Sequence, residues 1–265
     1  MSRKLFKIFI LCLTCTVLLV GPANSAKKTT GQNASGDEVK SSELTRIAIS
    51  KANSGNYSEA INFFEASIKA SGKNQLAYFN RGKVFMILGR YDKAIGDFDR
   101  ALKIGPETDS LYVARGMAYR LSGDFARAVK DFTKAVDVDP KNTNALINRA
   151  ALYFDMGEHE SALQDLDRIL KLDSKSFNAL GNRAYILEQL GRYDDAVKDL
   201  GSIIAIDPDN TMALKHLGHI SRQKGDLDKS IRWYRMALKS ESLDKVKSRI
   251  QEEIRELESK MGASR

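Results

Sequence analysis

Apolar residues in this chain recur three or four positions apart from Leu44 onward, with polar and charged residues between them. This spacing places apolar side chains along one face of an α-helix. The pattern returns every 34 residues without insertion, in six repeats: 41–74, 75–108, 109–142, 143–176, 177–210 and 211–244. Each repeat has glycine at its fifteenth place: Gly55, Gly89, Gly123, Gly157, Gly191 and Gly225. Because glycine readily takes the left-handed conformation that ends a helix, each repeat is predicted to form a helix (A), a turn and a second helix (B).

The repeated residue types identify the kind of repeat. In the second repeat the characteristic places are filled by Tyr78, Gly82, Phe85, Gly89, Tyr91, Ala94, Phe98, Ala101 and Pro106. This pattern resembles the tetratricopeptide repeat, and the resemblance covers about four-fifths of the chain. The resemblance implies an all-α fold, a right-handed α–α superhelical solenoid. In this family the A helices line a concave groove that holds a peptide or a partner's helix.

The start of the chain has the pattern of a secretory signal peptide. Residues 1–26 combine basic residues, an apolar run from Ile8 to Val20 and small residues before a cleavage point after Ser25 or Ala26. An uncleaved membrane anchor is the alternative. Residues 27–40 lack apolar periodicity and are predicted to be a flexible leader. We therefore expect an exported protein, periplasmic or secreted, with no stable membrane span after cleavage.

Composition and charge exclude several classes of site. Both cysteines, Cys12 and Cys15, lie in the signal segment, so the mature chain would have no thiol. Loss of three basic residues with that segment lowers the formal charge from +8 to +5, too small a value to indicate nucleic acid. No phosphate-binding loop, nucleophile motif or paired carboxylates in a predicted cleft occur, so neither catalytic residues nor a cofactor is expected. His216 and His219 are one helical turn apart, but without a third ligand no metal site is predicted.

The C-terminal segment 245–265 is predicted to be a capping helix and tail. From Leu243 its apolar residues are three or four apart with charged residues between them, which predicts one apolar stripe and therefore one partner. The favoured partner is the open end of the repeat stack. A self-associating coiled coil, and hence a homo-oligomer, is the alternative.

An arginine at place seven of four repeats is matched by an aspartate at place twenty-three, and both are missing together from the first and last repeats. Helices A and B are antiparallel, so these places lie at similar heights. We predict four structural ion pairs. An arginine ladder for anionic ligands is the alternative. The predicted pairs are Arg81 with Asp97, Arg115 with Asp131, Arg149 with Asp165 and Arg183 with Asp199.

A candidate partner-binding surface follows from the spacing of helix A. Places two, five, nine and twelve share a face outside the core positions, and place six borders it. Its asparagines can bond an extended backbone, and its basic end suits a peptide with acidic residues. Ordinary solvated helix residues are the alternative. The candidate groove residues are Phe79, Asn80, Lys83, Met117, Arg120, Asn144, Asn148, Asn178, Asn182, Tyr185, Lys215, His216, His219 and Arg222.

Together these features predict a non-enzymatic, exported scaffold or adaptor that binds a protein or peptide, most plausibly in a bacterial cell envelope. Two alternatives remain open. One is a structural or self-associating subunit of an envelope assembly, and the other is an accessory regulator of an envelope enzyme.

Overall fold

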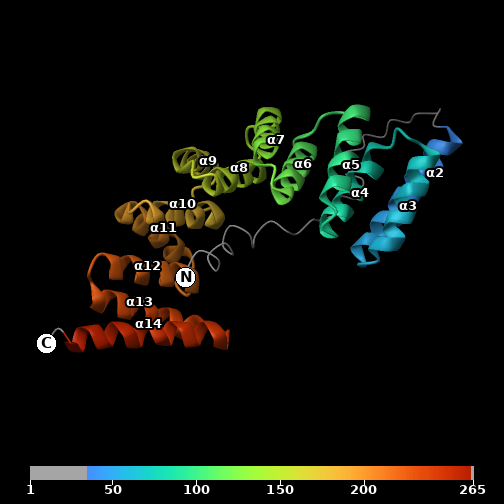
Figure 1. Ribbon diagram of the computed structural model, residues 1–265. Coiled ribbons are helices and arrows are strands. Elements are labelled where there is room, and N and C mark those ends of the chain that lie inside the picture. The colour runs from blue at the N-terminus through green and yellow to red at the C-terminus, as the bar shows by residue number, and fades with distance from the viewer. Residues whose placement is uncertain (1–34, 264–265) are drawn as a thin grey trace. The chain divides into compact units, whose positions relative to one another are not determined.

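The computed structural model describes residues 35–263, and this part of the chain contains thirteen α-helices and no strand (Figure 1). The fold is an all-α helical repeat solenoid, as the sequence predicts. The chain divides after Met156 into two compact units. The N-terminal unit contains α2 (Gly36–Asn53), α3 (Tyr57–Ala70), α4 (Gln75–Ile87), α5 (Tyr91–Ile104), α6 (Asp109–Ser122), α7 (Phe125–Val138) and α8 (Thr143–Asp155).

The C-terminal unit begins at Gly157 with the B helix of repeat four. It contains α9 (His159–Leu172), α10 (Phe177–Gln189), α11 (Tyr193–Ile206), α12 (Thr211–Gln223), α13 (Leu227–Ser240) and α14 (Asp244–Ala263). No helix among residues 35–263 is long and apolar enough to cross a membrane.

Glycine ends every A helix. The six glycines at place fifteen all have positive φ, between 69° and 89°. A side chain with a Cβ is strained in this conformation, which explains why no other residue type occupies the place. The B helices that precede a proline end two residues before it, as α5 does at Ile104 before Pro106. Turn glycine and proline thus set the helix boundaries.

The core of each repeat is built where a small residue of helix B lets helix A approach. Ala94 and Ala128 are fully buried, and one turn later on the same helices Phe98 and Phe132 are also 0% exposed. A Cβ added to Gly82 would lie 2.7 Å from the ring of Phe98, so the absence of a side chain allows the close approach of α4 and α5 at this point. Of the characteristic apolar places in repeat two, Phe85, Ala94, Phe98 and Ala101 are buried, whereas Tyr78 and Tyr91 are half-buried.

The flexible leader predicted for residues 27–40 does not extend to residue 40. Helix α2 begins at Gly36, so residues 36–40 are helical. Ser35 caps the helix: its Oγ accepts from Glu38 N at 3.3 Å, and Glu38 Oε2 accepts from Ser35 N at 3.2 Å. This reciprocal capping box starts a helix whose residues 36–40 are all exposed, which is why apolar periodicity does not predict its start. The signal segment 1–26 and leader residues 27–34 lie outside the described residues.

The C-terminal helix packs against its own chain. Ile250, Ile254 and Leu257 of α14 are at most 8% exposed and join a cluster with Leu214 of α12 and Tyr234 of α13. The apolar stripe of α14 is therefore covered within the C-terminal unit, which is the capping arrangement.

Candidate functional site

The A helices of the N-terminal unit form one part of the candidate surface, since α4 contacts α6 and α6 contacts α8. Phe79 and Met117 are half-buried on these helices, and Asn144 is exposed. The ammonium of Lys83 lies 5.3 Å from the centre of the Phe79 ring, a cation–π distance. This part of the surface thus combines aromatic and aliphatic side chains with amides.

The asparagines at place six are more enclosed than the rest of this surface. Asn80 is 0% exposed and Asn148 4%. Each donates from Nδ2 to the carbonyl oxygen four residues earlier, Asn80 to Leu76 at 3.0 Å and Asn148 to Asn144 at 2.8 Å. Ala114, at the same place in repeat three, is also buried. Place six is therefore buried in repeats two, three and four, and a role of its asparagines in holding a partner stays a prediction.

Arg120, the basic residue of this part, is engaged in an ion pair. Its Nη2 lies 2.8 Å from Asp155 Oδ2, which joins α6 to the end of α8. Only 16% of the Arg120 side chain and 29% of the Asp155 side chain are exposed. The arginine therefore links two repeats, and its charge is already balanced.

In the C-terminal unit, α10 and α12 are in contact and carry the rest of the candidate surface. Asn178 is exposed, while Asn182, Tyr185 and Lys215 are half-buried. His216 is buried, and its ring meets that of Tyr185 edge-on with centroids 6.1 Å apart. Amide and phenol groups are thus accessible on α10, and imidazoles lie beside them on α12.

Glu188 also lies among these residues, although the sequence pattern does not predict it as a site residue. It occupies place twelve of repeat five, and its side chain is only 4% exposed. Its Oε2 lies 2.5 Å from His216 Nδ1, and its Oε1 is hydrogen-bonded to His219 Nδ1. Burial alone would raise the pKa of Glu188, but the two histidine hydrogen bonds lower it to about 2. The expected basic end therefore contains a carboxylate that is ionised at neutral pH.

Arg222, the last basic residue of the candidate surface, is also paired. Its Nη1 lies 2.6 Å from Glu253 Oε2 and its Nη2 lies 2.8 Å from Glu256 Oε1, both on α14. These contacts fix the capping helix to α12. Arg120 and Arg222 thus serve repeat contacts, and the expected positive charge of the groove is smaller than a count of basic residues indicates.

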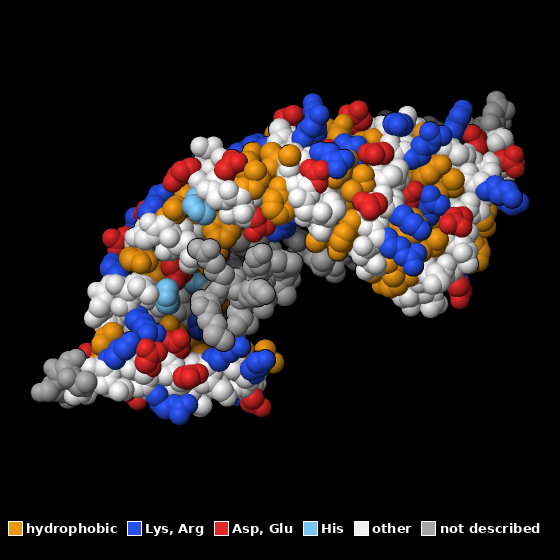
Figure 2. Space-filling view, in the orientation of Figure 1, with side chains coloured by type: hydrophobic (Ala, Val, Ile, Leu, Met, Phe, Trp, Pro, Cys, Tyr) orange, Lys and Arg blue, Asp and Glu red, His pale blue; other side chains and the backbone are white. Residues whose placement is uncertain are grey.

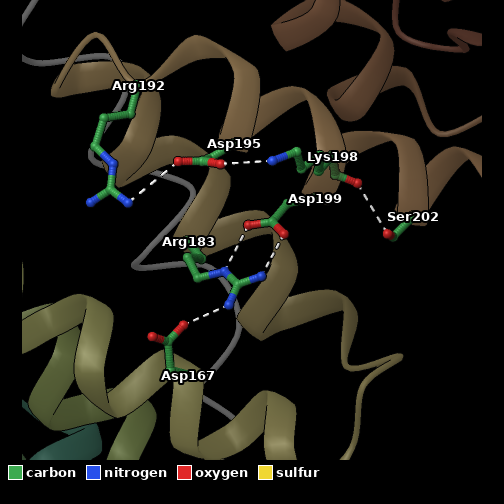
Figure 3. A network of polar contacts seen from close by, with 7 residues as sticks. All are labelled: Asp167, Arg183, Arg192, Asp195, Lys198, Asp199 and Ser202. Carbon is green, nitrogen blue, oxygen red and sulfur yellow. Dashed lines mark hydrogen bonds and ion pairs between the residues drawn. The ribbon is translucent and has the colours of Figure 1, made fainter.

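The place-seven arginines contact the aspartates predicted for them within each unit. Arg81 donates to both carboxylate oxygens of Asp97 at 2.8 and 2.7 Å. Arg183 contacts Asp199 in the same bidentate way at 2.8 and 2.6 Å (Figure 3). Hydrogen bonding to Asp199 raises the pKa of Arg183 above its usual value. Arg149 and Asp165 belong to different units, and their pairing stays a prediction.

Each of these arginines also reaches the preceding repeat, which the sequence interpretation did not predict. Arg183 Nη1 lies 2.5 Å from Asp167 Oδ1 on α9, as Figure 3 shows. The corresponding atom of Arg149 lies 3.1 Å from the hydroxyl of Thr133 on α7. The available signal was place twenty-five, where Glu65, Asp99, Thr133 and Asp167 stand. These contacts use the guanidinium groups to hold helices together within and between repeats.

The exposed surface has no strong charge segregation in the view of Figure 2. Lys and Arg side chains alternate with Asp and Glu over the N-terminal unit there. Among residues 35–263, no group of three or more His, Cys, Asp or Glu side chains is arranged to hold a metal ion.

Comparison with known proteins gives matches over most of the repeat region. Two family models, both described as tetratricopeptide repeat, match residues 45–107 and 182–244 in one case and 119–182 in the other. No curated protein matches the sequence of this chain.

Several solved structures share the fold. PilW, described as a widely conserved type IV pilus biogenesis factor, is 22% identical with a TM-score of 0.63, over 74% of this chain and 90% of that protein. YrrB, described as a TPR protein with an unusual peptide-binding site, is 20% identical with a TM-score of 0.55, over 64% and 88%. A repeat protein from Parabacteroides merdae is 18% identical with a TM-score of 0.58, over 84% and 86%. Identities this low carry the fold alone.

Proposed function

Because this chain belongs to the tetratricopeptide repeat family, we propose that it is a non-enzymatic scaffold that binds a peptide or a partner's helix on the inner faces of its A helices. Proteins of this family bind other proteins, so the scaffold role follows from membership. The observation that supports the location is the cluster of accessible amide and aromatic groups on α10, formed by Asn178, Asn182 and Tyr185. Such groups bond an extended backbone and pack against its side chains.

We propose that the bound segment of the partner is mostly uncharged at neutral pH. The charges of Arg120 and Arg222 are balanced by carboxylates of the chain itself. Lys215 is half-buried on α12, and burial lowers its pKa. A partner carrying an acidic residue would meet this lysine, whereas a highly acidic partner would also meet Glu188. We therefore propose a segment with few acidic residues rather than an acidic tract.

We also propose that the protein is exported and acts in a bacterial cell envelope. The support is the signal-like sequence of residues 1–26 and the confinement of both cysteines to it. Expression of the full chain followed by fractionation and intact-mass measurement tests this proposal. A mature species starting near residue 26 or 27 in the exported fraction is expected. A full-length species in the cytosol or membrane fraction would contradict it.

The binding proposal is tested with two matched variants. In the first, Asn178, Asn182 and Tyr185 are changed to alanine; in the second, Lys130 and Lys134, both exposed on α7, are changed to alanine. Each chain is used to capture proteins from envelope extract, and a captured protein is then purified and its Kd measured by calorimetry. We expect the α10 variant to bind at least about tenfold more weakly, and the α7 variant to bind like the wild type. Equal affinity of all three chains, with equal helicity, would place binding elsewhere.

A further inference from the structure

The contact between repeats five and six differs from the contacts between earlier repeats. In earlier repeats an arginine at place seven contacts place twenty-three of its own repeat and place twenty-five of the preceding one. At this junction the corresponding residues are Leu217, Trp233 and Gly201, none of which is charged. The inner side of the same junction instead has the histidine–glutamate cluster, formed by Glu188 of α10 with His216 and His219 of α12. Histidine has an ordinary pKa near neutral pH, whereas the arginine and aspartate side chains that join the earlier repeats have ordinary pKa values far from it.

His219 is the accessible member of this cluster. Its side chain is 44% exposed, against 7% for His216 and 4% for Glu188. Its Nδ1 is hydrogen-bonded to Glu188, and its Nε2 lies 3.2 Å from Gln223 Nε2. An ionised carboxylate oxygen only accepts, so Nδ1 carries the hydrogen of the neutral ring and Nε2 is left as an acceptor beside the Gln223 side chain. The neutral ring therefore offers an acceptor on its accessible side.

Protonation reverses this property of His219. The cation keeps its Nδ1 hydrogen bond to Glu188 and carries a second hydrogen on Nε2. The accessible side of the ring then donates, and Gln223 satisfies it only by rotating its amide so that Oε1 accepts. A carboxylate oxygen of a partner can accept from the same Nε2–H. The side chain thus changes from a site for N–H donors to a site for anions.

The charges around His219 set the direction of this change. Glu188 on α10 favours the cation, and Glu253 on α14 does the same at longer range, whereas Arg222 on α12 opposes it. Lys215 and His216 on α12 and Tyr185 on α10 are further titratable groups on these two helices, and Tyr234 of α13 interacts electrostatically with Glu188. The hydrogen bond to Glu188 raises the pKa of His219 above its ordinary value of 6.5. The cation of His219 is therefore more favoured here than that of a histidine in water.

We propose that His219 is a proton-controlled partner site: in its protonated form, held by Glu188, it binds a carboxylate of the partner segment, and on deprotonation it releases that carboxylate. This inference rests on the proposed binding role of the inner faces. Both carboxylate oxygens of Glu188 are hydrogen-bonded to the two histidines, so Glu188 is not available to bind a basic group of the partner. Lys215, one turn before His219 on α12, supplies a second positive charge.

Two labelled peptides test the proposal by fluorescence anisotropy with the full chain. One has a single glutamate flanked by small residues, and the other has glutamine at that position. From pH 8 to pH 6 we expect the affinity for the glutamate peptide to rise at least about tenfold and that for the glutamine peptide to stay constant. His219→Gln should abolish the increase, whereas Lys229→Gln, a change at an exposed residue of α13, should leave it intact.

Nuclear magnetic resonance measures the protonation of His219 separately from the binding of the peptide. The chain has three histidines, so the ring signal of His219 is assigned by its loss in His219→Gln. We expect Glu188→Gln to lower the midpoint of this signal's titration. An unchanged midpoint, pH-independent binding of the glutamate peptide, or failure of both peptides to bind at any pH would each overturn the inference. The proposed function would survive these results as long as a captured partner still depends on Asn178, Asn182 and Tyr185.

Discussion

Arg115 of α6 holds Asp131 of α7 through two parallel hydrogen bonds, Nε to Oδ2 and Nη2 to Oδ1, both 2.7 Å long. The remaining nitrogen, Nη1, lies 2.6 Å from Oδ1 of Asp99, on the B helix of the preceding repeat. One planar group thus closes a helical hairpin and ties it to its neighbour. Lysine cannot replace it, because only the guanidinium presents nitrogens in this fixed fork.

The two carboxylates of Arg115 should contribute very differently to stability. Only 4% of the Asp131 side chain is exposed, against 41% of the Asp99 side chain. Asp131→Ala should lower the free energy of unfolding by about 3 kcal/mol, because it leaves a partly buried guanidinium without its main partner. Asp99→Ala should cost less than about 1 kcal/mol, as exposed ion pairs do. Urea unfolding followed by circular dichroism measures both.

A double-mutant cycle separates the contact from the rest of each side chain. Arg115→Ala, Asp131→Ala and the double variant should give a coupling energy of at least about 1 kcal/mol, and the same cycle with Asp99 should give less. Equal coupling for the two aspartates would show that burial does not decide the strength of these pairs.

The sequence predicts this fold well because each repeat carries its own boundary signals. Gly123 and Pro140, for example, fix the ends of two helices through backbone conformation alone. The ion pair of Arg115 with Asp131 was also predictable, because arginine and aspartate are absent together from the terminal repeats.

Contacts between repeats were harder to predict, since they require the geometry of stacking. The second partner of the arginines was hidden because place twenty-five is Thr133 in one repeat and Gly201 in another. Glu188 is 28 residues from His216, and nothing in the local sequence distinguishes it from the many exposed carboxylates. The helix start at Gly36 was missed for a different reason, because hydrogen bonds of Ser35 and Glu38 define it rather than apolar spacing.

Two glycines of the same repeat should respond oppositely to substitution. Gly82→Ala should lower the free energy of unfolding by about 1 to 3 kcal/mol, because the new methyl group would meet the buried ring of Phe98 at 2.7 Å. Gly96, inside α5, has nothing within 4 Å of an added Cβ. Gly96→Ala should therefore raise the free energy of unfolding by about 0.5 to 1 kcal/mol through helix propensity.

Thermal unfolding of both variants beside the wild type checks this pair. The expected result is one midpoint below and one above that of the wild type. A lowered midpoint for both variants would mean that the space around an added methyl group does not decide the effect of substitution at these two glycines.

Stability should depend on pH through the histidine–glutamate cluster. The pKa of His219 is raised above 6.5, so its contribution is complete below that pH and is lost as pH rises through the folded value. The pKa of Glu188 is lowered from 4.5 to about 2, so its contribution is present above pH 4.5 and is lost as pH falls toward 2. The difference in unfolding free energy between wild type and Glu188→Gln should therefore be greatest between about pH 4.5 and 6.5.

Urea titrations of the two chains across this range measure that difference, and the comparison cancels the contribution of every other carboxylate. His219→Gln should remove the decline above pH 6.5 while leaving the decline below pH 4.5. A difference between wild type and Glu188→Gln that does not change with pH would exclude ionic coupling within the cluster.

The capping helix gives the last prediction. Leu257 of α14 is 0% exposed within the cluster that includes Leu214 and Tyr234, and Trp233 packs against the same cluster. Leu257→Ala should lower the free energy of unfolding of the C-terminal unit by about 2 to 5 kcal/mol, through lost burial and a new cavity. Glu252→Ala, an exposed change on the same helix, should leave it within about 0.5 kcal/mol.

Trp233 reports on this change directly, because it is the only tryptophan of the chain and it contacts the affected cluster. Its emission should shift at a lower urea concentration in Leu257→Ala than in the wild type or in Glu252→Ala. If α14 instead paired with a second copy of the chain, the midpoint would rise with protein concentration for the wild type. The ion pairs of Arg222 with Glu253 and Glu256 argue for the intramolecular arrangement, since they orient α14 on α12 of the same chain. A midpoint independent of protein concentration is therefore the expected result.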